Sequence, residues 1–66
     1  MSIAEYKAKW PDSHIKVGTL LTIENLVQTM GASKVDHEFL QPIKILGIVS
    51  SDEYIDLLLF AKSCGR

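Results

Sequence analysis

Residues 22–31 have the sequence TIENLVQTMG, and this stretch carries the clearest structural signal in the chain. Its apolar residues recur at the spacing i, i+3, i+4, i+7, which places them on one face of a helix. These residues are Ile23, Leu26, Val27 and Met30. Thr22 can cap the first turn, and Gly31 stands where a helix often ends in a left-handed conformation. We therefore predict a helix over residues 22–30.

Two further segments precede this helix. Ser2 and Glu5 have the spacing of a capping box, in which two side chains satisfy free amides at a helix start. A short helix is predicted over residues 2–10, with Ile3, Tyr6 and Trp10 on one face and Pro11 ending it. The segment 14–21 contains alternating apolar residues interrupted by a glycine, and it predicts a short strand.

The segment that follows predicts a second long helix, over residues 33–46. Ser33 and Asp36 again have capping-box spacing. Four apolar residues gather on one side of this helix: Val35, Phe39, Ile43 and Leu46. Pro42 lies inside it, where proline removes a hydrogen bond and clashes with the preceding turn at a cost of about 3 kcal/mol. Either the helix kinks at Pro42, or it ends near Leu40 and Pro42 begins a strand. We favour the kink.

Residues 47–62 predict a β-hairpin. Side chains that favour strands occur at 48–49 and again at 54–60, and the polar residues 50–53 between them have the composition of a turn. With the three helices, this hairpin predicts one α+β domain that covers residues 1–66. A chain of this length buries a small core, so self-association is the expected reinforcement.

Composition excludes several classes of protein. The chain has seven basic and eight acidic residues and a net charge of −1, so a nucleic-acid contact would have to come from a local basic patch. Cys64 is the single cysteine, so no internal disulfide forms and no zinc-ligand spacing exists. We expect neither a metal nor a cofactor. With no signal peptide at the start, the expected location is the cytoplasm, a reducing compartment.

No group of residues suggests catalysis. Histidine is a common catalytic acid or base, but neither His14 nor His37 has a nucleophile or an acidic partner at a recognisable spacing. Cys64 lies near the end of the sequence, and an incidental thiol is the simplest interpretation. We therefore expect that the protein is not an enzyme.

Two stretches resemble the winged helix–turn–helix family. Residues 21–33, LTIENLVQTMGAS, resemble the second helix and turn of such domains, and residues 40–49, LQPIKILGIV, resemble the end of the recognition helix and the entry to the wing. The resemblance covers about residues 21–60. It implies a small winged helix in which the hairpin at 47–62 is the wing. It also implies a DNA-binding transcriptional regulator. Because the chain has few cations and DNA affinity rises with the number of neutralised phosphates, we expect this regulator to act as a dimer that doubles the basic patch.

In that geometry the outer face of the second helix of the pair contacts bases in the major groove. The residues predicted to make these contacts are Lys34, His37, Gln41 and Lys44, and Ser33 would hold a phosphate at the helix start. The alternative is a winged helix that binds a protein, either a larger partner or a second copy. Apolar residues of the hairpin would then form the interface, namely Leu57, Leu59 and Phe60.

Overall fold

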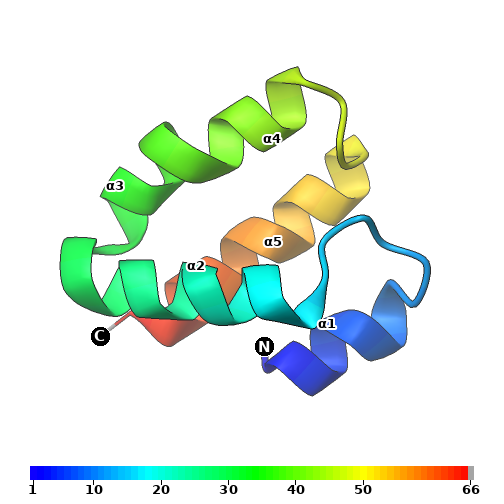
Figure 1. Cartoon of the computed structure of the whole chain (residues 1–66), viewed down its shortest axis with the longest axis horizontal. Helices are drawn as coiled ribbons and strands as arrows, with labels where there is room; N and C mark the ends of the chain where they lie inside the picture. The colour runs from blue at the N-terminus through cyan, green and yellow to red at the C-terminus, as the bar shows by residue number, and fades with distance from the viewer. Residues whose placement is uncertain (66) are drawn as a thin grey trace.

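The computed structural model describes residues 1–65, and all of its regular elements are helical (Figure 1). In chain order they are α1 (Ile3–Lys9), α2 (Val17–Met30), α3 (Ala32–Val35), η1 (Asp36–Leu40), α4 (Gln41–Ile45) and α5 (Ser51–Cys64). The elements α3, η1 and α4 follow one another without a break, and we call the continuous segment 32–45 the composite helix. η1 is a turn of π-helix within it.

The predicted α+β winged helix is wrong, because the segment predicted as a hairpin is helix α5. Ser50 caps this helix by accepting a hydrogen bond from the backbone N–H of Glu53 at 3.2 Å. Its buried residues recur at helical spacing, at positions 53, 54, 56, 57, 60 and 61. This spacing puts them on one face of a helix, whereas a strand would divide them between two faces. Residues 1–65 contain no strand and therefore no wing.

The predicted strand at 14–21 is also wrong, because α2 begins at Val17 and includes most of that segment. Lys16 occupies the N-cap position without a side-chain hydrogen bond, so no capping residue marks this helix start. Thr22 lies inside α2, where its hydroxyl donates to the carbonyl of Gly18 at 3.0 Å. The predicted end at Gly31 is confirmed, since α2 stops there with a φ of 95°.

The helix predicted over residues 33–46 forms as the composite helix, and the strand alternative at Pro42 is excluded. It begins after Gly31 with no side-chain cap, so the predicted capping role of Ser33 is wrong. Just before Pro42, the N–H of Gln41 donates to the carbonyl of Asp36, five residues back. This wider turn adds one residue to the helical repeat. As a result Leu40 is fully buried and Phe39 only partly buried, although simple periodicity predicts Phe39 as the core residue.

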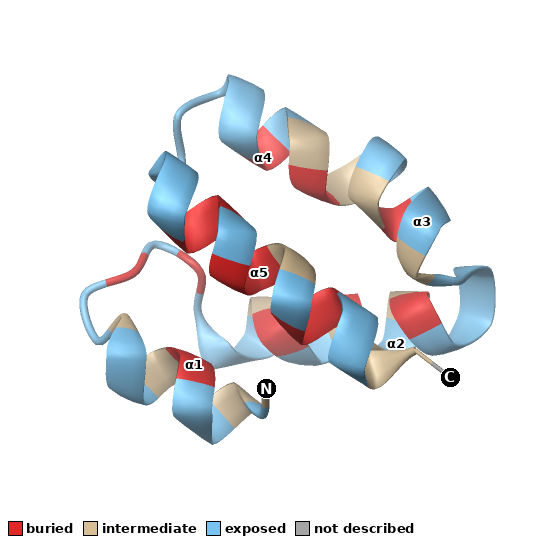
Figure 2. Ribbon diagram, turned by 180° about the vertical axis from the view of Figure 1, so that it is seen from behind, coloured by how far each residue is buried: buried red, intermediate tan, exposed pale blue. Residues whose placement is uncertain are grey.

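The core lies where α2, α5 and the composite helix face one another, with α1 packed against α2 and α5 (Figures 1 and 2). Its fully buried large side chains are Tyr6, Phe60, Leu20, Ile23, Leu40, Leu57 and Val35. They come from α1, α2, the composite helix and α5, so each of these elements contributes to one core. No helix within residues 1–65 is long and apolar enough to cross a bilayer.

Candidate interaction surfaces

Three large apolar side chains lie exposed where the composite helix ends and the chain turns toward α5. Ile45 is 81% exposed, Leu46 is 74% exposed and Ile48 is 38% exposed. We call these three residues the apolar tip. Single exposed apolar residues are common on protein surfaces, but these three lie within four positions, which makes the apolar tip a candidate interaction surface.

The backbone of the apolar tip is fixed by hydrogen bonds at both ends. Gly47 has a φ of 74°, its N–H donates to the carbonyl of Lys44 at 3.0 Å, and the N–H of Ile48 donates to the carbonyl of Ile43 at 3.1 Å. This pair of bonds around a left-handed glycine is the Schellman motif that closes many helices. Val49 is buried, and the Ser50 cap of α5 follows it. Hydrogen bonds thus define the backbone of the tip on both sides.

Tyr54 of α5 holds the composite helix in place. Its hydroxyl donates to a carboxylate oxygen of Asp36 at 2.7 Å, and the ammonium of Lys44 lies 4.9 Å from the centre of its ring. Burial, together with the hydrogen bond to Asp36, raises the pKa of Tyr54 to about 12. The phenol is therefore neutral at physiological pH and remains a hydrogen-bond donor.

The residues predicted to contact DNA all lie on the composite helix. Ser33, Lys34 and His37 are exposed, and Gln41 is partly buried. Lys44 is exposed as well, but its ammonium contacts the ring of Tyr54. This side of the helix thus carries few free cations.

The residues predicted for a partner interface do not share one surface. Leu57 and Phe60 belong to the core, with exposed fractions of 0% and 1%, whereas Leu59 is 50% exposed. A strand would have placed Leu57 and Leu59 on one face, but a helix turns them about 200° apart. Only Leu59 of the three is available to a partner.

A buried polar cluster, which the sequence did not predict, joins α1 and the segment after it to α5. Glu53 is 7% exposed, and one of its carboxylate oxygens accepts hydrogen bonds from the hydroxyls of Tyr6, at 2.5 Å, and Ser13. The Ser13 oxygen in turn accepts from the N–H of Ile15 at 3.0 Å. Burial, followed by the hydrogen bond to Glu53, raises the pKa of Tyr6. All the polar groups have partners, so this cluster is structural.

Asp56 makes a second connection between the same two elements. Its carboxylate accepts from the indole N–H of Trp10 at 2.6 Å and lies 2.9 Å from the ammonium of Lys9. The hydrogen bonds from Lys9 and Trp10 lower the pKa of Asp56. The sequence signal for the Glu53 connection is the acidic first turn of α5, and that signal depends on recognising α5 as a helix.

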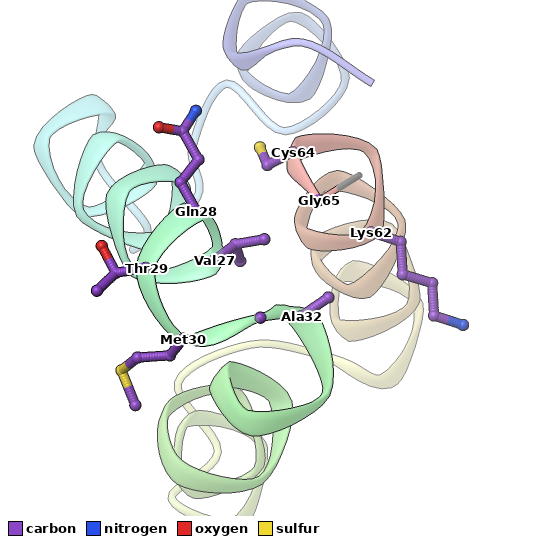
Figure 3. A pocket seen from close by; sticks show the side chains of 9 residues that line it. Val27, Gln28, Thr29, Met30, Ala32, Lys62, Cys64 and Gly65 are labelled. Carbon is purple, nitrogen blue, oxygen red and sulfur yellow. The ribbon is translucent and has the colours of Figure 1, made fainter.

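Two adjoining surface pockets share Gln28, Cys64 and Gly65 near the C-terminal ends of α2 and α5, and Figure 3 shows the larger of them. The larger, of about 730 Å³, is lined by Val27, Gln28, Thr29, Met30, Gly31, Ala32, Lys62, Cys64 and Gly65. Cys64 is partly buried there, and this burial, with the negative charge of Glu24, raises the pKa of its thiol. A raised pKa disfavours the reactive thiolate. Within residues 1–65 no three potential metal ligands cluster.

Comparison of the chain with protein-family models, with curated proteins and with solved structures finds no match. The resemblance of residues 21–60 to winged helices therefore stays a prediction from short stretches of sequence, and the hairpin wing it implies is absent from the described residues. The surfaces of the molecule provide the remaining guide to its function.

Proposed function

We propose that the protein is an interaction module that binds a partner protein through the apolar tip. The observation that carries the proposal is the exposure of Ile45 and Leu46, at 81% and 74%, at the end of a helix whose other large apolar residues are mostly covered. Covering an exposed Leu or Ile side chain completely contributes roughly 1.5–3 kcal/mol. A partner that covers both Ile45 and Leu46 gains this free energy at each of them.

The fixed backbone of the tip favours binding further. The Schellman motif at Gly47 and the Ser50 cap of α5 hold the turn from both sides. The turn therefore loses little conformational entropy when a partner binds it, and preorganisation of this kind increases affinity. The proposed module binds as an already folded surface.

DNA binding is the second candidate, and the charges support it less. Lys34 and His37 are exposed on the composite helix, but Glu38 is exposed beside them and repels phosphate. Affinity for DNA rises with the number of phosphates that cations neutralise. With Lys44 in contact with Tyr54, Lys34 is the one lysine of this helix without such a contact.

An intracellular, reducing compartment remains our inference for where this module works. It rests on the single cysteine of the chain. Structural disulfides are typical of small secreted domains, and this chain cannot form one internally.

The test uses a photoreactive amino acid at Ile48, on the edge of the tip, in cells or in extract. We expect a cross-link to one discrete protein, and we expect the double substitution Ile45→Ser, Leu46→Ser to abolish it. A photoreactive group at Asn25, exposed on α2, is the matched control and should not capture that protein. Because all four positions are exposed, the helical circular dichroism of each variant should match that of the unmodified chain.

The same preparations are titrated with mixed-sequence duplex DNA at several salt concentrations. Binding at low salt that weakens in Lys34→Ala, with a log–log salt slope smaller by about one, would replace our proposal with DNA binding. A cross-link at Ile48 that persists in the double substitution would also contradict a role for the tip.

A further inference from the structure

The outer face of α5 carries a second set of exposed residues, remote from the core. Asp52, Ile55, Leu59 and Lys62 are all exposed, and Ile55 and Leu59 are 55% and 50% exposed. Their successive spacings are three, four and three residues, the spacing of the contact positions along a coiled-coil helix. We call these four residues the α5 stripe.

The α5 stripe lies opposite the buried face of the same helix. At 100° per residue, its members fall within about 80° of one another, on the side away from the core residues Leu57 and Phe60. Figure 2 shows α5 lying in front of α2, with exposed segments recurring along its length. The stripe is therefore a continuous strip of surface along one helix.

We propose that two copies of the chain pair through the α5 stripe, with their α5 helices antiparallel. In this arrangement Asp52 of one copy lies opposite Lys62 of the other, and Ile55 lies opposite Leu59 of the other. Both pairs have their midpoint at position 57, so a single two-fold axis at that position satisfies all four contacts. A two-fold interface requires this kind of self-complementarity.

The charges at the ends of the stripe select the antiparallel direction. Asp52 and Lys62 are ten residues apart, about 15 Å along the helix. In a parallel pair Asp52 would face Asp52 of the other copy and Lys62 would face Lys62, so like charges would repel at both ends. In the antiparallel pair two ion pairs flank an apolar centre, which is the common arrangement of a polar rim around an interface core.

A shallow groove beside the stripe gives the opposite side chains a place to pack. It measures about 330 Å³ and is lined by Lys9, Trp10, Asp52, Ile55 and Asp56. Leu59 of the second copy, lying opposite Ile55, extends to this groove and can cover the half-buried ring of Trp10. The pairing uses a surface distinct from the apolar tip, and it does not depend on the proposed partner protein.

Charge reversal tests both the pairing and its direction. Sedimentation equilibrium from micromolar to millimolar concentration measures the dimer dissociation constant of the unmodified chain, of Asp52→Lys, of Lys62→Asp and of the double variant. Each single reversal places like charges together at two symmetric contacts, and we expect it to weaken dimerisation about tenfold. The double variant restores both pairs, and we expect its dissociation constant to return near that of the unmodified chain.

The double variant also separates pairing from folding. Both substitutions place unfavourable charges at the ends of α5 and reduce helix stability slightly, so an effect on folding alone would be largest in the double variant. Ile45→Ser, at the apolar tip, is the control and should leave dimerisation unchanged.

A chain that is monomeric at all concentrations would overturn the proposal. So would a double variant that dimerises no better than the singles, or a dimer that Ile45→Ser dissociates. The last result would place self-association at the tip.

Discussion

Glu53 shows how one residue can link three parts of a small fold. It is an acid in the first turn of α5, where the helix dipole favours negative charge, and it receives hydroxyl groups from α1 and from the segment that follows α1. A buried carboxylate is tolerated when several donors satisfy it. Here the donors are Tyr6 and Ser13, so the cost of burying the charge is offset by bonds that connect distant segments.

We expect Glu53→Ala to reduce the free energy of unfolding by about 3 kcal/mol, because it leaves two buried hydroxyl donors without an acceptor. Urea unfolding followed by circular dichroism measures the change. Glu38→Ala, at an exposed position on the composite helix, is the control and should change stability by less than about 0.5 kcal/mol. Equal effects in the two variants would show that the buried cluster does not hold α1 on α5.

Among the elements, α5 shows most clearly where sequence prediction fails. Residues 54–60 are rich in side chains that favour strands, and this local preference predicts a hairpin. Tertiary packing overrides it, because one helical face buries Tyr54, Leu57 and Phe60 together. The sequence does contain one signal for this helix, because Ser50 and Glu53 have the same capping-box spacing as Ser2 and Glu5 at the start of α1.

The composite helix was predicted well in extent and less well in detail. Its bounds follow from periodicity, and Pro42 marks the position of its irregularity. The choice of a π turn at 36–40 was not predictable, because it depends on which of Phe39 and Leu40 the core accommodates. A continued α-helical repeat would place Leu46 on the buried side with Val35, but Leu46 is exposed in the structure.

Alanine should have opposite effects on stability at two glycines, one at an element boundary and one inside a helix. Gly31 joins α2 to α3 with a φ of 95°, which an L residue adopts only with strain, so Gly31→Ala should destabilise the fold by about 1–3 kcal/mol. Gly18 lies within α2, so Gly18→Ala should stabilise it by about 0.5–1 kcal/mol.

Neither added methyl group meets another atom within 4 Å, so the two changes compare backbone effects alone. Thermal unfolding of both variants, run beside the unmodified chain, measures them. If Gly31→Ala were as stable as the unmodified chain, the junction of α2 and α3 would have to adopt another conformation.

At the scale of the whole molecule, stability depends on one core shared by all helices, and both tyrosines contribute to it in neutral form. Burial and carboxylate acceptors raise the pKa values of Tyr6 and Tyr54, the latter to about 12. Their stabilising effect is complete below the unfolded value of about 10, and it is lost as pH rises through the folded value. We expect cooperative unfolding in alkali above pH 10, with tyrosinate absorbance and loss of helical circular dichroism in one transition.

Tyr54→Phe should reduce the dependence of stability on pH in this range, since it removes one of the two buried phenols. Glu38→Gln is a control that should leave the alkaline transition unchanged. Tyrosinate that forms near pH 10 while the helices remain intact would show that the phenols are accessible in the folded protein.

The surfaces of the whole molecule were harder to predict than its elements. The sequence identifies Lys34, His37 and Gln41 as one side of a helix, and the structure places them on that helix. It does not reveal that Lys44 contacts Tyr54, or that Ile45 and Leu46 lack a cover, because both depend on how the composite helix meets α5. Interaction surfaces arise from such junctions between elements.

The hydroxyl of Ser63 donates to the carbonyl of Met1 at 2.9 Å, so the first residue and the last turn of α5 meet at one corner of the fold. In Figure 1 both ends of the chain lie on the lower side, and the turn between α4 and α5 lies at the upper right. A tag or a further domain fused at either end therefore leaves the molecule from the same side. If the molecule is tethered by either end, Ile45 and Leu46 therefore lie on the side that faces away from the attachment point.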